Sequence, residues 1–319
     1  MTKPAMISLS DIEAARIRIA PHVRKTPVMQ VAAVRHPLAL SNNVILKLEL
    51  FQVTGSFKAR GAMNRYLGDP NGKPKGGIVT ASGGNHGLAV ARTAHAANTT
   101  ATVFVPKSVS PEKVERMRDW NADVRVVGDE WMISNEAALT FATQHGATYF
   151  HPFADPLVVA GQGTLGLEIA EQINDLDAIV VAIGGGGLIS GLSTAIKTAN
   201  PSIKVIGVEP EGSPTLKASL DAGHVVRLPE VTSRVATMSC RQTNDRIFDI
   251  VNSQVDEVLL VSDDDMLAAS RWLWSEFAIA ADLSGAASIA ALNRWPKRFT
   301  SYRKICALIC GAGSDGIGR

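Results

Sequence analysis

The sequence is poor in cysteine and carries no excess of either charge, and each of these shortages excludes a class of protein. Its three cysteines, Cys240, Cys306 and Cys310, are an odd set without the CxxC pairs of a zinc site, which indicates a reducing, cytoplasmic setting. The 32 basic and 30 acidic residues leave a formal net charge of +2, too small to favour nucleic acid or an acidic membrane surface as a partner. No apolar run approaches the roughly 20 residues that span a bilayer, and residues 1–20 lack the apolar core of a signal peptide.

The composition instead favours a folded protein with a large interior. Of the 319 residues 46% are hydrophobic, enough to fill one large core or two modest ones. The pattern Ser10-x-x-Glu13 predicts a capping box that opens a helix ending near Pro21, and residues 56–67 predict a second helix. Strands are predicted at 44–50, 78–81, 101–105, 124–127, 179–183, 205–208, 258–261 and 305–309, with helical stretches between most of them.

This alternation predicts the α/β fold class, with parallel sheets covered by helices and ligands bound in the loops beyond the carboxyl ends of the strands. Two turn-rich stretches, 68–77 and 149–156, bracket three of the strands and predict a smaller unit inserted into a larger one. We therefore expect a large domain made of residues 1–74 and 149–319, and a small α/β domain made of residues 75–148.

The first loop of interest, Thr54–Gly61, contains a lysine in the first turn of a predicted helix, directly after a glycine turn. Lys58 would lie near the positive end of the helix dipole and in partly apolar surroundings, and both conditions lower the pKa of its amine. A neutral lysine amine can form a Schiff base. An ordinary surface lysine at a helix start is the alternative, and this loop alone does not exclude it.

The second loop, Thr80–Gly87, joins a strand to a helix and is suited to a carboxylate. Backbone N–H groups at that junction, the Ser82 hydroxyl and the Asn85 amide can all donate hydrogen bonds to an anion. An amino-acid substrate carries such a carboxylate. A plain turn, with Asn85 as the helix cap and His86 at the surface, is an equally good interpretation of this loop alone.

The third loop has four consecutive glycines, Gly184–Gly187, between a strand and a helix that begins at Leu188. Four glycines let the backbone curl around a phosphate while the helix N-terminus faces it. No Lys-Ser/Thr pair follows the glycines, which argues against a P-loop. A dinucleotide site is a rival interpretation, because Gly185-x-Gly187-x-x-Ser190 nearly matches the GxGxxG fingerprint and Glu209 ends the next strand.

With a last loop, Cys310–Gly316, these loops resemble in their order the serine/threonine dehydratase and serine racemase family of fold-type II pyridoxal 5'-phosphate (PLP) enzymes. The resemblance begins at Arg24–Pro27 and also covers His151–Phe153 and Ala160–Thr164. It implies two open, twisted α/β domains with PLP between them. Because relatives with this fold usually pair through the large domain, it also implies a homodimer.

The resemblance implies roles for individual residues. Lys58 would bind PLP as a Schiff base, Phe57 would pack on the pyridine ring, and Asn85 would bond the 3'-oxygen. Cys310 matches the residue that faces the pyridine nitrogen. The implied phosphate ligands are Gly184, Gly185, Gly186, Gly187 and Leu188. The implied ligands of the substrate carboxylate are Ser82, Gly83, Gly84, Asn85 and His86.

The resemblance further implies an ammonia-lyase that acts on a small β-hydroxy amino acid. Lys58 would remove the α-proton and the β-hydroxyl would leave, so that L-threonine gives 2-oxobutanoate, L-serine gives pyruvate, and both give ammonia. Cys310 favours this β-elimination over transamination, because a neutral thiol donates only weakly to the pyridine nitrogen and fast loss of a β-leaving group does not require a strong electron sink.

Several positions depart from the family pattern. Racemases of the family carry a serine where this chain has Gly83, so we predict weak racemase activity at best. Glu209 matches one ligand of a divalent-metal site found in some members, but the second acidic residue is absent and a metal is not expected. Val235–Met238 and Asp282–Ala287 also differ from the usual motifs, so the side-chain specificity can differ from that for threonine or serine. The sequence stops soon after Asp315, and no regulatory domain is expected.

Several functions remain open from the sequence alone. The same chemistry could serve another β-hydroxy amino acid, such as 3-hydroxyaspartate or phenylserine, since no residue fixes the pocket beyond Cβ. An amino-acid racemase is a further alternative. A nicotinamide-dependent oxidoreductase would leave residues 54–58 and 82–85 unexplained, and a non-catalytic amino-acid-binding protein would have no need of Lys58.

Overall fold

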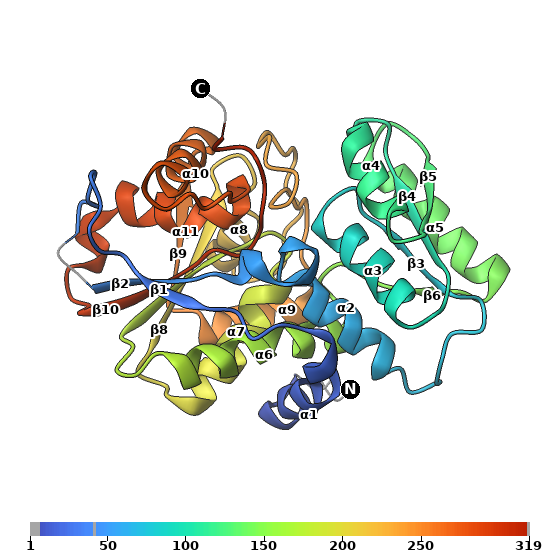
Figure 1. Cartoon of the computed structure of the whole chain (residues 1–319), viewed down its shortest axis with the longest axis horizontal. Helices are drawn as coiled ribbons and strands as arrows, with labels where there is room; N and C mark the ends of the chain where they lie inside the picture. Colours follow the sequence, from blue (N-terminus) through green and yellow to red (C-terminus); the bar gives the residue numbers. More distant parts are fainter. Residues whose placement is uncertain (1–6, 41–42, 318–319) are drawn as a thin grey trace.

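The computed structural model describes residues 7–40 and 43–317 and contains a six-stranded and a four-stranded sheet (Figure 1). The strands of the larger sheet follow the order β1-β2-β10-β7-β8-β9 and are parallel, except for the antiparallel pair β1 and β2. Their bounds are β1 (Val28–Gln30), β2 (Asn43–Lys47), β7 (Ala178–Ala182), β8 (Lys204–Pro210), β9 (Glu257–Val261) and β10 (Lys304–Leu308).

The smaller sheet is parallel throughout and has the order β5-β4-β3-β6. Its strands are β3 (Ile78–Ala81), β4 (Ala101–Val105), β5 (Asp123–Val126) and β6 (Thr148–Tyr149). The chain thus enters this sheet once, after β2, and leaves it once, before β7. The division into domains at residues 74/75 and 148/149 stays a prediction, and the second of these boundaries falls inside β6.

Helices cover both sheets, and Figure 1 places α6 and α7 on one face of the larger sheet and α10 and α11 on the other. Helix α2 contacts both α6 and α3, so it lies between the two sheets. Within residues 7–40 and 43–317, no helix is both long and apolar enough to cross a membrane. The helices are α1 (Leu9–Ile19), α2 (Lys58–Leu67), α3 (Asn85–Ala96), α4 (Pro111–Arg118), α5 (Trp131–His145), α6 (Pro156–Gln172), α7 (Gly187–Ala199), α8 (Thr215–Ala222), α9 (Asp245–Gln254), α10 (Asp263–Phe277) and α11 (Leu283–Arg294).

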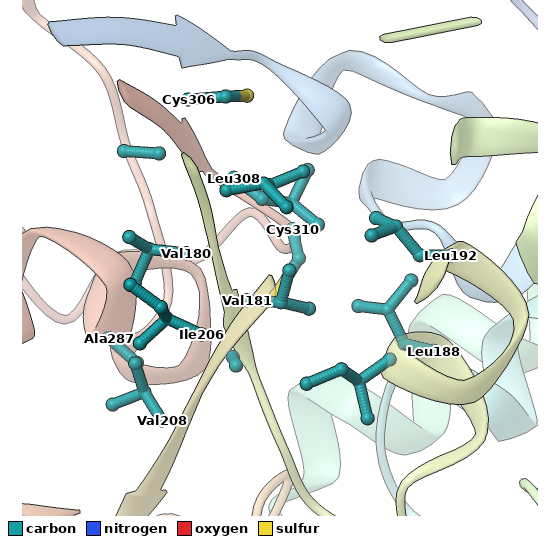
Figure 2. Close-up of a cluster of buried hydrophobic side chains, with 14 of the residues drawn as sticks. Val180, Val181, Leu188, Leu192, Ile206, Val208, Ala287, Cys306, Leu308 and Cys310 are labelled. Atoms are coloured by element: carbon teal, nitrogen blue, oxygen red, sulfur yellow. The ribbon is translucent and has the colours of Figure 1, made fainter. Parts of the chain in front are cut away.

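The core of the larger sheet is apolar on both faces. In Figure 2, Leu188 and Leu192 of α7 lie on one side of the strands, while Ala287 of α11 lies on the other side, next to Ile206. A strand buried on both faces is a continuous apolar run rather than an alternating one, which is why β7 has the sequence AIVVA. This rigid sheet presents the loops that follow β2, β10 and β7 side by side, because these strands are adjacent and parallel.

The α/β class predicted from the sequence is confirmed, and most strands lie within two residues of their predicted positions. The prediction for residues 44–50 was wrong at its end: β2 stops at Lys47, and the chain turns into a 3-10 helix at Glu49–Phe51. The second helix begins at Lys58 rather than residue 56. The strands β1 and β6 were missed, because two or three residues are too few to establish an alternating pattern.

The capping box that opens α1 is formed by Ser8 and Asp11, so the prediction of Ser10 and Glu13 was wrong. The Ser8 hydroxyl accepts from the Asp11 N–H at 3.3 Å, and Asp11 Oδ2 accepts from the Ser8 N–H at 2.8 Å. Ile7 and Ile12 are both buried on either side of this cap, as a hydrophobic staple requires. The apolar positions therefore select the earlier of two possible serines.

A buried network of four charged side chains fixes α2 against the larger sheet. Arg60 donates to Glu49 through Nε (2.6 Å) and Nη2 (2.9 Å), and to Glu168 through Nη2 (2.9 Å). Lys47 donates to the other oxygen of Glu168 at 2.5 Å, and the Thr26 hydroxyl donates to Glu49 at 2.7 Å. Lys47 and Glu49 are completely buried, and Arg60 is 2% exposed. The charges of the two cations and the two anions balance. Arg60 lies two residues after Lys58 in α2, so the network is next to the start of that helix.

Candidate active site

Lys58 lies at the start of α2 with its amine held by a backbone carbonyl. Its Nζ donates to the Pro152 carbonyl at 2.7 Å and lies 5.2 Å from the centroid of the Phe57 ring. Burial lowers the pKa of this amine to about 8, although the nearby thiols of Cys310 and Cys240 oppose the shift. With this pKa roughly a fifth of the Lys58 population is neutral at pH 7.4, and this neutral form is the one that nucleophilic or basic chemistry requires.

The four glycines between β7 and α7 leave backbone donors unused. Within the described residues, the N–H groups of Gly184, Gly185 and Gly186 donate no hydrogen bond, and the first N–H groups of α7 have no partner within the helix. Gly186 has a φ of +91°, which a side chain rarely tolerates. A Cβ on Gly185 would lie 2.2 Å from the Phe153 ring. The loop thus offers unpaired N–H donors to an anion, and the Phe153 ring packs against it.

The loop after β3 presents a second set of donors at the start of α3. The Ser82 hydroxyl accepts from the Gly84 N–H at 3.3 Å and remains free to donate. His86 turns away from this loop: its Nε2–H donates to the Phe150 carbonyl at 3.1 Å, and burial lowers its pKa to about 3. Because Nδ1 of this neutral ring can only accept, the His86 side chain offers a carboxylate no donor. Its backbone N–H, in the first turn of α3, still does.

Cys310 follows β10 directly and is buried near Leu308 and Val181 (Figure 2). Its Sγ donates to the Ser284 carbonyl at 3.5 Å, and its own carbonyl accepts from the Phe57 N–H at 3.3 Å. Burial raises the pKa of the thiol far above its usual range, and the neighbouring Asp282 adds to this shift. Cys310 is consequently a neutral thiol, with its main chain tied to the segment that carries Lys58.

Comparison with known proteins identifies the family. A family model described as pyridoxal-phosphate dependent enzyme matches residues 19–311. The chain belongs to this family. Among relatives of this PLP enzyme, the L-threonine ammonia-lyase of Thermotoga maritima is 36% identical over 97% of this chain and 76% of its own length. The phenylserine dehydratase of Ralstonia pickettii is 34% identical over 96% and 93%. The structure of maize serine racemase is 30% identical, with a TM-score of 0.90 over 97% of this chain and 96% of that one.

The residues of this PLP enzyme fit the cofactor of its family. PLP carries a phosphate, an aldehyde and a pyridine ring. The unused N–H groups of the glycine loop suit the phosphate, the Lys58 amine suits the aldehyde, and the Cys310 thiol is a neutral partner for the ring nitrogen. Three of the four loops singled out in the sequence therefore supply a matching group for each part of the cofactor.

Asp282 connects this site across the two sheets, and the sequence did not identify it as a site residue. Its Oδ1 accepts from the Gly285 N–H (2.6 Å) and the Ser284 hydroxyl (2.7 Å), which caps α11. Its Oδ2 accepts from the Asn85 amide at 3.0 Å. Burial raises the pKa of Asp282. The only sequence feature that points to this residue is its departure from the family motif at Asp282–Ala287.

Glu209, the residue that matches a family metal ligand, has both oxygens occupied by the protein. The completely buried carboxylate accepts from the N–H groups of Leu216 and Lys217, both at 2.8 Å, at the start of α8. Burial raises its pKa to about 8. In the part of the chain that the structure describes, no group of three or more His, Cys, Asp or Glu side chains is placed to hold a metal ion.

Gly83 occupies a position where a side chain has no room. A Cβ there would lie 2.1 Å from Cγ2 of Val109. We expect Gly83→Ser to destabilise the protein by about 1–3 kcal/mol through overpacking, and to raise the production of D-serine from L-serine by supplying the missing proton donor. The double variant Gly83→Ser/Val109→Ala should recover the lost stability, because it removes the clashing methyl groups.

The urea midpoint and chiral chromatography of the products test this prediction, with Val109→Ala alone as the control. A Gly83→Ser protein as stable as the wild type would mean that Val109 moves aside freely. In that case, packing against Val109 would not be the reason why this chain has glycine rather than the racemases' serine at position 83.

Proposed function

We propose that this PLP enzyme catalyses the β-elimination of a small β-hydroxy amino acid, such as L-threonine or L-serine, to a 2-oxo acid and ammonia. The observation that carries the proposal is the Lys58 amine, whose pKa lies near 8 and which is close to the neutral thiol of Cys310. The L-threonine ammonia-lyase of Thermotoga maritima, a relative over 97% of the chain, supports the same reaction. The dehydratase and ammonia-lyase names of the relatives also favour it over the nicotinamide-dependent alternative.

In this proposal the chain binds each part of its ligands with a separate loop. Gly184, Gly185, Gly186, Gly187 and Leu188 hold the phosphate, Phe57 packs on the pyridine ring, and Cys310 faces the ring nitrogen. The substrate carboxylate binds to the Ser82–His86 loop through the Ser82 hydroxyl and the backbone N–H groups at the start of α3. Asn85 bonds the 3'-oxygen of PLP in this proposal, and its hydrogen bond to Asp282 restricts the rotation of its amide. These contacts orient the Cα–H bond of the substrate toward Lys58.

PLP, when bound, supplies a Schiff base to the substrate amine and withdraws electrons from Cα. Lys58 then removes the proton from Cα, and the Cα–H electron pair becomes the second bond between Cα and Cβ as the hydroxyl leaves. Lys58 is the general base because its neutral amine is populated at pH 7 to 8. Hydrolysis of the released product gives the 2-oxo acid and ammonia.

Two features favour elimination over racemisation in this proposal. A racemase needs a proton donor on the face of Cα opposite the lysine, and Gly83 offers none where the family's racemases have a serine. The neutral Cys310 thiol is a weak partner for the ring nitrogen, which suits a reaction with a good leaving group at Cβ. The maize serine racemase has the same fold, so the fold alone does not decide the activity.

The side-chain specificity depends on the segment Val235–Met238, which lies between two binding loops. A Cβ on Gly84 would be 3.5 Å from the Thr237 methyl group, and one on Gly184 would be 3.0 Å from the Thr237 carbonyl. A substituent on Cβ of the substrate would meet this segment. The phenylserine dehydratase of Ralstonia pickettii makes an aromatic substrate the main alternative, followed by 3-hydroxyaspartate.

The experiment is to measure 2-oxo acid and ammonia release by the purified protein with PLP. The substrates are L- and D-serine, L- and D-threonine, 3-hydroxyaspartate and phenylserine. We expect L-threonine or L-serine to be the best substrate. A preference of tenfold or more for phenylserine or hydroxyaspartate would keep the reaction and change the substrate. No product from any of these amino acids, with PLP bound, would overturn the proposal.

We also propose that the enzyme works in the cytoplasm as a homodimer. The sequence composition supports the first expectation, and the usual pairing of its family through the large domain supports the second. All three cysteines are free, as a reducing compartment requires.

A further inference from the structure

The four residues His151–Ala154, which follow β6 and precede α6, form a tight turn around one imidazole. His151 Nδ1 accepts from the N–H of Phe153 at 3.2 Å and from the N–H of Ala154 at 2.9 Å. Because Nδ1 accepts both bonds, the ring proton lies on Nε2 and the imidazole is neutral. Pro152, inside the turn, has a fixed φ and no N–H of its own. The direction of its carbonyl therefore follows from the two bonds to His151.

This turn touches two parts of the proposed active site at once. The Pro152 carbonyl accepts the hydrogen bond from Lys58 Nζ at 2.7 Å. The next residue, Phe153, packs against the glycine loop, where a Cβ on Gly187 would lie 2.8 Å from the Phe153 carbonyl. The Phe153 and His151 rings also meet edge to face, with 4.6 Å between their centroids. The turn thus connects the Lys58 amine to the loop assigned to the phosphate.

We propose that His151 is a positioning residue for Lys58: it fixes the turn whose Pro152 carbonyl holds the Lys58 ammonium group after that amine has taken the substrate proton. The inference rests on the proposed function, since it concerns the base of that reaction. It assigns a role to His151 and Pro152 that neither the sequence motif nor the family resemblance provided.

The proton balance of the step is simple. The bond between Cα and its hydrogen breaks, and a third N–H bond forms on Lys58. The electron pair of the broken bond becomes the second bond between Cα and Cβ, while the Cβ–O bond breaks and its own electron pair leaves with the hydroxide. The resulting ammonium needs an acceptor in surroundings that do not favour charge. A hydrogen bond to the charged form of a group stabilises that form, and a carbonyl oxygen at 2.7 Å is such an acceptor. Without it, Lys58 would be a weaker base.

The titratable groups around Lys58 carry no charge that could stabilise its ammonium form, which leaves the Pro152 carbonyl as its main hydrogen-bond acceptor. The facing titratable groups are the imidazoles of His86 and His151 and the thiols of Cys240 and Cys310. Burial lowers the pKa of His151 to about 4, with Lys58 adding to the shift and Asp155 opposing it. Burial also raises the pKa of Cys240, to about 11. From pH 5 to 9 these four groups stay neutral, so Lys58 is the one member of this described cluster that titrates.

The chain offers a matched set of variants at position 151. Asparagine places its Oδ1 at the same position along the side chain as Nδ1 of histidine, so His151→Asn can still accept from Phe153 and Ala154. His151→Leu places a methyl group there and accepts nothing. His151→Gln keeps the amide but moves the acceptor outward by one CH₂ group. The contrast between Asn and Gln remains informative even if the Leu variant does not fold.

The first readout is the pKa of Lys58 in the full-length chain without PLP, from competitive acetylation at several pH values and mass spectrometry of the Lys58 peptide. Exposed Lys107 serves as the internal reference. We expect His151→Leu and His151→Gln to lower the Lys58 pKa by about one unit, because the charged form loses its acceptor. His151→Asn should stay within about 0.3 units of the wild type by the same argument.

The second readout is the pH profile of the PLP-loaded enzyme with its best substrate. Activity requires neutral Lys58, so kcat falls as pH drops below the Lys58 pKa. In His151→Leu and His151→Gln this limb should move to lower pH by the same unit. The plateau of kcat should fall about tenfold with little change in KM, because the amine is less well held. His151→Asn should retain most of the plateau.

An unchanged Lys58 pKa in folded His151→Leu or His151→Gln would overturn the proposal, as would a His151→Asn protein that behaves like His151→Gln. Circular dichroism melting establishes that each variant is folded. The acetylation experiment needs neither substrate nor turnover. A wild-type enzyme that released no product would therefore overturn the proposed function and leave the pKa comparison standing.

Discussion

Replacing Lys58 with alanine should lower kcat for 2-oxo acid release by about 10²–10⁴-fold or more, the contribution expected of a positioned general base. The reason is specific to this side chain. Its amine is the one that burial brings to a pKa of about 8 and that the Pro152 carbonyl orients at 2.7 Å. Loss of the amine that would hold PLP covalently should add to the effect.

The measurement is ammonia and 2-oxo acid release under saturating substrate, with PLP binding followed by fluorescence. Lys107→Ala is the matched control, because Lys107 is 66% exposed and, among the described residues, forms an ion pair only with Asp129, which is 76% exposed. That control should react like the wild type. Lys58→Ala should still bind PLP through the glycine loop. Product release at the wild-type rate by Lys58→Ala would place the base elsewhere.

Replacing Arg60 with methionine should destabilise the protein by about 3–5 kcal/mol, the second largest effect we expect. Arg60 is 2% exposed and makes three charge-assisted bonds with Glu49 and Glu168. These two carboxylates hold the pKa of Arg60 above its usual value, although burial works against the charge. Methionine fills a similar volume but leaves Glu49 buried without its main partner, which is costly in an apolar interior.

The urea midpoint of the PLP-free protein measures this effect. The control is Arg118→Met on α4, where Arg118 and Glu115 pair at 2.7 Å but are 50% and 63% exposed. An exposed pair contributes about 0.2–1 kcal/mol, so this variant should unfold close to the wild type. The triple variant Arg60→Met/Glu49→Gln/Glu168→Gln should regain part of the loss, because it removes the unpaired charges. Equal midpoints for Arg60→Met and Arg118→Met would show that the network is not needed.

The fold and most of the site loops could be predicted from the sequence because each rests on a local pattern. The buried strands β3 and β7 are short runs rich in β-branched residues, and the loops at Ser82 and Gly184 follow them directly. Strand ends that face a parallel neighbour gather at one edge of a sheet, so finding the strands locates the loops. The glycines and the lysine then suggest the chemistry.

The remaining features depend on contacts between distant segments, which no local pattern encodes. The Pro152 carbonyl is a backbone atom and has no side-chain signature. Lys47 and Glu49 alternate with leucines, and charged residues in such a pattern normally predict an exposed strand face. Here they are buried, because Arg60 and Glu168 arrive from two helices to neutralise them. His86 was expected to face a carboxylate, but its ring bonds Phe150.

The position of β10 in the larger sheet governs when the site can form during synthesis. β10 lies between β2 and β7, although the ribosome makes it after every other strand in the described chain. Until β10 has been made, β2 and β7 lack the strand that pairs with both of them. Cys310, whose carbonyl accepts from the Phe57 N–H, has also not yet been made. The smaller sheet is complete once Tyr149 has been made. The backbone N–H and C=O groups on the edges of β2 and β7 that pair with β10 therefore stay unpaired for more than a hundred residues of translation after β7 has been made, a period in which a holding chaperone would protect the nascent chain.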